Sequence, residues 1–324
     1  MTHTNGLIFA HCLDGKGGTN PLEWAGVRNW SPQDGPLWMH LERSDPYAAE
    51  WLKRDSGIDP LVLSAMLAED PRPRSFPHGE GLLMILRGVN TTPGAEPDDM
   101  VSVRIWVARD RIVSVRKRRL ISATDVSKRL LAGNGPRDSA ETLLAIAEAL
   151  AANMAPVIDE LDEKVSELED RVVSGEKLPL RSELSEMRRQ AIRLRRYISP
   201  QRDVLARFQT ENLPWLTEMH KAMMREVTDR TTRIVEDLEE ARERAAVTQE
   251  EIANRVAEQM NRTMFLLSIV ATIFLPLGLL TGLLGINVGG MPGADAPVAF
   301  WVVCALLVVL GFGEAWLLKK MRIF

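Results

Sequence analysis

The stretch "MFLLSIVATIFLPLGLLTGLLGINVGGMPG", residues 264–293, decides the fold, because it carries no charge and is long enough to cross a lipid bilayer. Apart from Asp295, no charged residue occurs from position 263 to position 313. A helix that rises about 1.5 Å per residue needs about 20 apolar residues to cross about 30 Å of hydrocarbon. The sequence therefore predicts two transmembrane helices, at roughly 264–284 and 298–318. The alternative is a buried helical hairpin in a soluble core.

Basic residues flank this predicted membrane hairpin on one side only. They are Arg255 and Arg262 before it, and Lys319, Lys320 and Arg322 after it. The connecting loop has no basic residue, and positive charge favours the cytoplasmic side of a membrane. We therefore expect both termini in the cytoplasm and the loop outside. The N-terminal apolar run is too short, and lacks the basic flank, for a signal peptide.

Residues 1–136 carry the signals of a cytoplasmic α/β domain. "DPYAAEWLKRDSG" and "DPLVLSAMLAED" predict short helices. Short apolar or alternating runs predict strands at 37–41, 81–89, 100–108 and 111–116. Clusters such as "PRPRSFPHGEG" and "NTTPGAEPDD" bound these strands and are interpreted as loops.

Long helices begin at Ser139 and predict a helical hairpin over residues 137–213. Its first helix ends in an acidic tract, from Asp159 to Asp170, and its second helix is rich in arginine. An acidic helix followed by a basic one across a short turn suggests an antiparallel pair with complementary faces. Two independently solvated surfaces explain the pattern equally well. The carboxylates could attract cations by their field, although an ordinary exposed face is the default interpretation.

The next segment lacks helix breakers, since neither proline nor glycine occurs between Pro214 and Pro276. A helix of about 60 residues would be about 90 Å long. Apolar and small residues recur at spacings of three and four from Leu216 to Val256, a heptad-like seam typical of helices that associate around an axis. We expect a stalk helix over residues 214–262 that continues into the first membrane span and associates with its copies.

The same spacing continues along the first membrane span as a stripe of small and polar residues. The stripe is Asn261, Met264, Ser268, Ala271, Leu275, Gly278, Gly282 and Gly285. Polar groups are costly in lipid, so this stripe should face protein or water on the same side as the seam. Around a shared axis it would line a pore, with apolar rings at Met264 and Leu275 that gate by expelling water. Small residues also permit close helix packing without a pore, and the pattern alone leaves both possibilities open.

The motif "GIN" at 285–287, after a proline-containing span and before "MP", resembles the CorA-type divalent cation transporters. Their signature is Gly-Met-Asn at the outer end of the first of two C-terminal spans. The whole chain is similar to that family's layout of α/β domain, helical hairpin, stalk helix and membrane hairpin (263–324, outer loop 285–297). The resemblance implies an α+β membrane protein that assembles as a homopentamer in the inner membrane of a bacterium.

Two departures from the family pattern concern the substrate. Isoleucine replaces the signature methionine, and the loop lacks the acidic residue often found after "MP". Together with "RRYISPQRDVLARF" and "FAHCLDGKGG", this variant resembles the zinc-transporting branch of the family. Magnesium, nickel or cobalt are the alternative cargoes.

The resemblance also implies roles for individual residues. Gly285, Ile286 and Asn287 would form the filter at the outer mouth, where the Asn287 carboxamides bind the water shell of an arriving cation. Capture of a hydrated ion avoids a large cost of dehydration. The implied pore lining and gate are Asn261, Met264, Ser268, Ala271 or Thr272, Leu275 and Gly278.

Zinc binds tightly to thiolate, imidazole and carboxylate groups, and none lies on this stripe. Direct coordination is therefore not the expected basis of selectivity, since an ion that binds too tightly does not leave. Glu314 in the second span could serve a proton step. Its place near the basic end instead favours an interfacial position or a pair with Lys319 or Lys320.

The remaining conspicuous residues indicate no further chemistry. Histidines 11, 40, 78 and 220 are scattered and have no metal-site spacing. "RKRR" at 116–119 predicts a solvated strand end rather than a nucleic-acid site. We find no nucleophile and base arrangement and expect neither an enzyme nor a cofactor beyond the transported cation. The alternative to a transporter is a membrane-anchored structural or sensing protein, which would not need Asn287 or a polar stripe.

Overall fold

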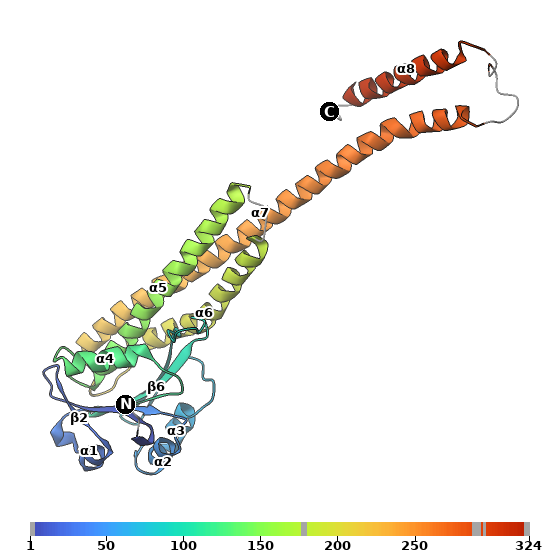
Figure 1. Cartoon of the computed structure of the whole chain (residues 1–324). Helices are drawn as coiled ribbons and strands as arrows, with labels where there is room; N and C mark the ends of the chain where they lie inside the picture. Colours follow the sequence, from blue (N-terminus) through green and yellow to red (C-terminus); the bar gives the residue numbers. More distant parts are fainter. Residues whose placement is uncertain (1–3, 176–179, 287–292, 294–295, 321–324) are drawn as a thin grey trace. The chain divides into compact units, whose positions relative to one another are not determined.

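The computed structural model describes residues 4–175, 180–286, 293 and 296–320 of the chain (Figure 1). The chain divides into two compact units, Met1–Gln249 and Glu250–Phe324. The first unit combines the α/β part, the helical hairpin and the beginning of the long helix. The second unit holds the rest of that helix and the C-terminal helix.

A seven-stranded mixed sheet forms the base of the first unit, in the order β2-β1-β3-β7-β6-β5-β4. The β3–β7 pair is parallel and the other pairs are antiparallel. The strands are β1 Leu7–Leu13, β2 Thr19–Leu22, β3 Leu37–Glu42, β4 Arg74–His78, β5 Gly81–Gly88, β6 Val101–Val107 and β7 Arg111–Arg116.

Four of these strands, β3, β5, β6 and β7, lie where the apolar runs predicted them, whereas β1, β2 and β4 were not predicted. The interpretation of "PRPRSFPHGEG" as a loop is wrong, because β4 lies inside it. Pro77 and the polar neighbours concealed the strand. A proline is tolerated there because β4 is an edge strand, which needs ladder hydrogen bonds on one side only.

Helices cover both faces of the sheet, as Figure 1 shows. One face carries α1 Trp24–Asn29, α2 Pro46–Arg54 and α3 Pro60–Met66, and the other carries α4 Ile121–Leu131 and the ends of the long helices. Short 3-10 helices span Thr4–Gly6 and Pro32–Asp34. Helices α2 and α3 begin with Asp-Pro, where Asp45 and Asp59 accept backbone N–H bonds and proline occupies the first turn. The two predicted short helices are therefore confirmed.

The predicted helical hairpin consists of α5 Ser139–Val173 and α6 Leu180–Phe208. Asp138 caps α5 by accepting a hydrogen bond from the Glu141 N–H. The charges of the hairpin do not pair as predicted: among the described residues, no acidic residue of α5 pairs with a basic residue of α6. Arg171 of α5 pairs with Glu183 of α6, the reverse polarity, and Arg195 of α6 pairs with Glu239 of the long helix instead.

The long helix α7 runs from Glu218 to Leu284 without interruption, as predicted, and passes through Pro276. Its predicted start at residue 214 is four residues too early, because residues 214–217 are not helical. Helix α8 follows at Ala299–Lys320. Within the described residues, three helices are long and apolar enough to cross a membrane: α5, α7 and α8. The apolar window of α5 is 56% buried inside the protein, against 0% for α7 and 6% for α8. Helices α7 and α8 are therefore the predicted membrane hairpin.

The heptad-like seam of α7 packs inside the chain along part of its length. Val227, Ile234 and Leu238 belong to the core that α5 and α6 share with the sheet, and Ala241 and Ala245 are buried. The prediction that this part of the seam joins copies of the chain is wrong. A heptad repeat indicates that a helix has a helical partner, and here the hairpin of the same chain supplies it.

The expectation that seam and stripe share one side of α7 does not follow from helix geometry. Leu275 follows Leu238 by 37 residues, which at about 100° per residue places it about 100° around the axis of a straight α-helix. The seam at Leu238 and the stripe at Leu275 therefore lie on different sides of the helix.

Candidate ion pathway and acidic cavity

In the second unit, one face of α7 packs on α8. The covered residues of α7 are Ile269, Ile273, Pro276, Leu277 and Leu280, which are buried or half-buried at helical spacing. Leu277 lies beside Gly311 of α8. The covered residues of α8 are Val303, Cys304, Leu307, Gly311, Glu314 and Leu318, again at spacings of three and four.

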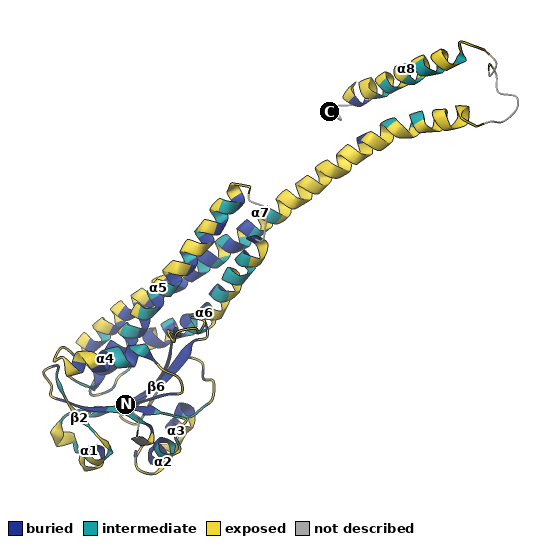
Figure 2. Cartoon of the chain, viewed as in Figure 1, coloured by how far each residue is buried: buried dark blue, intermediate teal, exposed yellow. Residues whose placement is uncertain are grey.

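The predicted pore stripe lies on the other side of α7 and is uncovered in a single chain (Figure 2). At 3.6 residues per turn, its centre is about 150° from the face that packs on α8. All of its predicted lining residues are exposed: Asn261, Met264, Ser268, Ala271, Thr272, Leu275 and Gly278. The Thr272 hydroxyl donates to the Ser268 carbonyl at 2.7 Å, which satisfies it within the helix. This face is left for lipid, water or another copy of the chain.

The predicted filter is described only in part. The Gly285 N–H donates to the Thr281 carbonyl at 2.9 Å and so closes the last turn of α7. Ile286 follows with an exposed side chain. Asn287 lies outside the described residues, so its role as the filter stays a prediction.

Glu314 occupies the covered face of α8. Its Oε2 is buried and has no hydrogen-bond partner in the part of the chain that the structure describes. The expected pair with Lys319 or Lys320 is wrong for these residues. Ion pairs along a helix join residues three or four apart, and the two lysines follow at five and six. Lys320 instead stacks over Trp316 at 5.2 Å.

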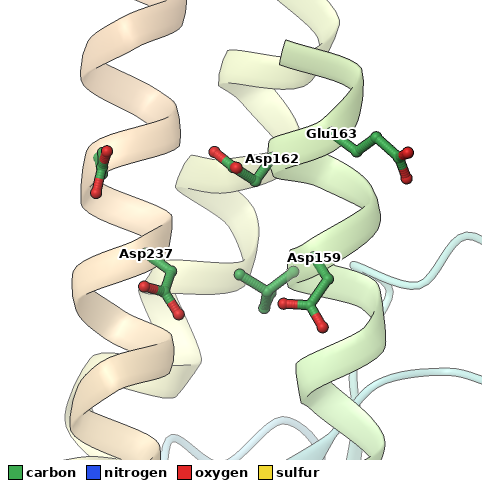
Figure 3. A pocket seen from close by; sticks show the side chains of 6 residues that line it. Asp159, Asp162, Glu163 and Asp237 are labelled. Atoms are coloured by element: carbon green, nitrogen blue, oxygen red, sulfur yellow. The ribbon is translucent and has the colours of Figure 1, made fainter. Parts of the chain in front are cut away.

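An acidic cavity of about 310 Å³ lies between α5 and α7 in the first unit (Figure 3). Its lining is Ile158, Asp159, Asp162 and Glu163 of α5 with Asp237 and Glu240 of α7. Burial raises the pKa of Asp237, and repulsion from Asp159 and Glu240 raises it further. The sequence showed the acidic tract on α5. It gave no signal that α7 would add carboxylates to it, because charges of both signs fill that stretch of α7.

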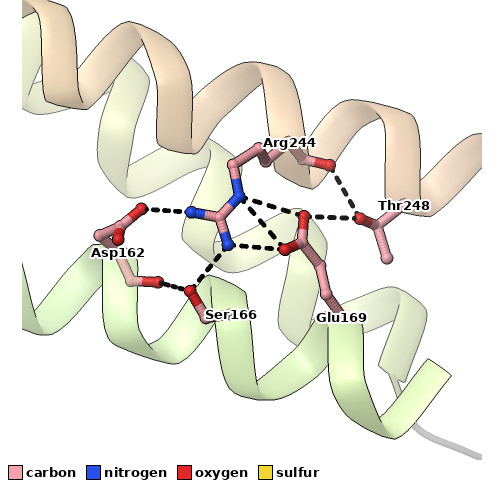
Figure 4. Close-up of polar contacts among 5 residues, drawn as sticks. All are labelled: Asp162, Ser166, Glu169, Arg244 and Thr248. Carbon is pink, nitrogen blue, oxygen red and sulfur yellow. Dashed lines mark hydrogen bonds and ion pairs between the residues drawn. The ribbon is translucent and has the colours of Figure 1, made fainter. Parts of the chain in front are cut away.

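Arg244 of α7 binds the cavity residue Asp162 and fastens α7 to α5 (Figure 4). Its Nη1 donates to Asp162 at 2.8 Å, and its Nη2 donates to Glu169 at 2.6 Å and to the Ser166 hydroxyl at 2.7 Å. The Thr248 hydroxyl lies 3.2 Å from Glu169. The hydrogen bond to Glu169 is the main reason that the pKa of Arg244 is raised. The remaining cavity carboxylates have no ion pair among the described residues.

Asp138, Glu141 and His220 bring three potential metal-ligand atoms within 4.8 Å of one another. The hydrogen bonds favour helix capping instead. The Thr217 N–H donates to His220 Nδ1 at 3.3 Å, so a neutral ring carries its proton on Nε2, which lies 3.4 Å from Asp138. A metal on Nε2 would remove that proton, leave the Thr217 N–H facing an unprotonated ring, and so require an imidazolate.

Comparison with known proteins identifies the family. A family model described as "CorA-like Mg2+ transporter protein" matches residues 33–320. The zinc transport protein ZntB of Pectobacterium atrosepticum is 41% identical over 318 residues, which cover 98% of this chain and 96% of the relative. The chain belongs to the CorA family.

Two further comparisons concern a divalent cation transporter. The divalent cation transporter CmaX of Pseudomonas aeruginosa is 38% identical over 321 residues, 98% of this chain and 96% of the relative. The solved structure of full-length CmaX matches with a TM-score of 0.87 at 36% identity, over 99% of this chain and 100% of that one. The predicted CorA-type fold of an N-terminal α/β domain, a long helix and two apolar C-terminal helices is thereby confirmed.

Proposed function

We propose that this CorA-family protein transports divalent cations across the inner membrane of a bacterium, through a pore that copies of α7 form around a shared axis. The observation that carries the proposal is the uncovered face of small and polar residues on α7. A helix that serves only as an anchor gains nothing from such a face, since polar groups are costly in lipid. Two relatives are named as zinc and divalent cation transporters, ZntB and CmaX, which supports the same activity here.

Zinc is the cargo that we favour, with magnesium, nickel and cobalt as alternatives. The uncovered face offers amide, hydroxyl, thioether and backbone groups but none of the thiolate, imidazole or carboxylate ligands that hold zinc tightly. Weak contacts let an ion leave as readily as it enters. Selection would then occur where Asn287 meets the hydrated ion, before any water is lost.

We infer an assembly of five copies with both termini in the cytoplasm, as in the family that the chain resembles. Five Asn287 side chains would surround the outer mouth, next to Gly285 and Ile286. Rings of Met264 and Leu275 would close the pore by expelling water. Between these two rings the lining would consist of Ser268 and either Ala271 or Thr272. Gly278 would line the pore on the outer side of Leu275, and Asn261 on the cytoplasmic side of Met264.

The test is zinc flux into proteoliposomes that contain purified Asn287→Ala. We expect flux to fall about tenfold or more, because a hydrogen bond to a charged group is worth about 1.5–3 kcal/mol. Asn254→Ala is the matched control, since Asn254 lies on the same helix outside the apolar span and is exposed. Unchanged flux and ion preference in an intact Asn287→Ala oligomer would contradict the filter. Absence of flux for every divalent ion in the unaltered protein would favour the non-conducting anchor.

Proton coupling is a second candidate property, and the position of Glu314 favours it. Its carboxyl lies on the face of α8 that packs on α7, and its Oε2 has no partner among the described residues. Carboxyl groups inside membranes often belong to proton relays in pumps and transporters. In Glu314→Gln we expect downhill zinc flux to persist and its response to a pH gradient to disappear. An equal response in Glu314→Gln and in the unaltered protein would exclude this role.

A further inference from the structure

A second cavity in the first unit is positively charged. It lies on the sheet face that carries α2 and α3, beyond the end of α3, and has a volume of about 310 Å³. The strand register explains the clustering, because Arg87 of β5 pairs directly with Ser102 of β6. Arg104 follows two residues later on the same face. The lining is Glu69, Asp70, Arg87, Val101, Ser102, Arg104, Lys117 and Arg118, so basic side chains outnumber acidic ones by two.

Arg104 is a buried cation without a carboxylate partner in the described part of the chain. The residue is 1% exposed. Its Nη2 donates to the carbonyl oxygens of Ala68 at 3.0 Å and Glu69 at 3.3 Å, while its Nε and Nη1 find no partner among the described residues. Burial, together with repulsion from the neighbouring Arg43 and Arg87, lowers the pKa of Arg104 to about 10. The protein has therefore placed a guanidinium where its charge is poorly compensated.

Arg87 is also buried, and its counter-charge is weak. It donates to the carbonyl oxygens of Met100 at 3.1 Å and Pro71 at 2.9 Å, and its guanidinium stacks on the ring of Tyr197 at 4.3 Å. Its ion-pair partner is Asp70, whose side chain is 70% exposed and so is screened by water. The Arg87 Nε has no partner in the described residues.

A purely structural role accounts for part of this arrangement. The carbonyl oxygens after α3 need donors, and one guanidinium edge of each arginine supplies them. That role leaves the remaining N–H groups of Arg104 and Arg87 unexplained. It also gives no reason for Lys117 and Arg118 at the rim, since like charges raise the cost of burying two guanidinium groups.

We propose that this cavity binds a phosphate-bearing anion, either inorganic phosphate or the phosphates of a nucleotide. Lys117 and Arg118 would contact it at the rim, and Arg87 and Arg104 would balance its charge from below. Guanidinium groups match phosphate oxygens in charge and geometry, and a lysine adds a flexible point charge. Asp99 already accepts a hydrogen bond from Arg118 at 3.0 Å and holds that side chain in place.

The test is calorimetric titration of the purified full-length protein with potassium phosphate and, separately, with ATP in the absence of magnesium. Potassium gluconate at the same ionic strength is the control anion. We expect saturable binding of one phosphate group per chain. Tighter binding of ATP than of phosphate would identify a nucleotide as the ligand, and equal affinity would identify the phosphate group alone.

Two matched variants locate the site. Lys117→Gln removes a rim charge, and we expect it to weaken binding about tenfold, the worth of one charged hydrogen bond. Arg119→Gln removes a positive charge two residues further along the chain. Arg119 is exposed and does not line the cavity, so this variant should leave the affinity for phosphate unchanged. Equal weakening by both variants, or no saturable binding, would overturn the proposal. Zinc flux is a separate measurement, so its loss would leave this result intact.

Discussion

Two buried histidines in the sheet of the first unit show how single side chains are held uncharged. His11 of β1 and His40 of β3 each have a ring centroid 5.0 Å from that of Phe9. Burial lowers the pKa of His11 to about 4, and burial with the nearby Arg116 lowers the pKa of His40 to about 3. Both rings are therefore neutral at physiological pH.

Ser114 determines which nitrogen of His40 carries the proton. Its hydroxyl donates to the Met39 carbonyl at 3.0 Å and accepts from the Trp38 indole at 2.9 Å. It can then only accept from His40 Nδ1, at 2.8 Å, so that nitrogen is protonated. In the sequence these histidines appear scattered. No spacing rule links His40 on β3 to its partner Ser114 on β7.

Acid should destabilise the first unit through His11. Its pKa is lower in the folded state than the unfolded value of 6.5, so the unfolded chain binds the proton first. The resulting stability is complete above pH 6.5 and is lost as the pH falls toward 4. Between pH 7.5 and pH 5 we expect a loss of about 2 kcal/mol from this group.

Thermal unfolding followed by tryptophan fluorescence at the two pH values measures this loss. His11→Gln should reduce the pH dependence. A pH dependence in His11→Gln equal to that of the unaltered protein would show that His11 does not contribute.

At the scale of elements, Arg244 joins α7 to α5 by contacts that the sequence could not indicate. Its partners Asp162 and Glu169 lie on α5, far away along the chain, and all three side chains are partly buried. Partial burial strengthens such a pair relative to one fully in water. Loss of the arginine would remove the ion pairs of both carboxylates, and Asp162 lines a cavity that is already acidic.

Arg244→Gln should therefore lower the free energy of unfolding of the first unit by about 2 kcal/mol, allowing for solvent at the half-exposed groups. Arg230→Gln on an exposed part of the same helix is the matched control, with an expected change within about 0.5 kcal/mol. Urea titration compares the two. Amide exchange along α7 should rise near Arg244 in the first variant only; a uniform rise in both would contradict the local role.

The elements were predictable where one local rule dominated. Apolar runs predicted β5 and β6, the Asp-Pro pairs predicted α2 and α3, and the absence of proline and glycine predicted α7. Strand β4 escaped because an edge position overrides the usual meaning of Pro77. Contacts between distant elements, such as those of Asp237 and Arg104, depend on packing that no spacing rule specifies.

At the scale of the whole molecule, α7 packs against its own chain in one part and forms an apolar span in another. From Val227 to Thr248, α7 buries small and apolar residues against its own chain. In the apolar span it covers one face with α8 and leaves the opposite face open. The two faces lie at different angles around α7, because Leu275 follows Leu238 by 37 residues, which is about 100° around a straight helix. A face that is free in one chain is available to join copies around an axis, as the proposed pore requires.

Ser268→Cys tests whether that open face lines a conducting pore or only packs. In a pore of several copies, reduced thiolates would meet the permeating ion, bind zinc tightly and hold it, so we expect zinc flux to fall sharply in the presence of reductant. Val270→Cys is the matched control, since Val270 is exposed on the same helix about 160° from Ser268. Flux of magnesium, which has little affinity for thiolates, should be affected much less than that of zinc. If both variants conduct zinc as the unaltered protein does, Ser268 does not face the ion, because a thiolate ring in the path could not leave zinc flux unchanged.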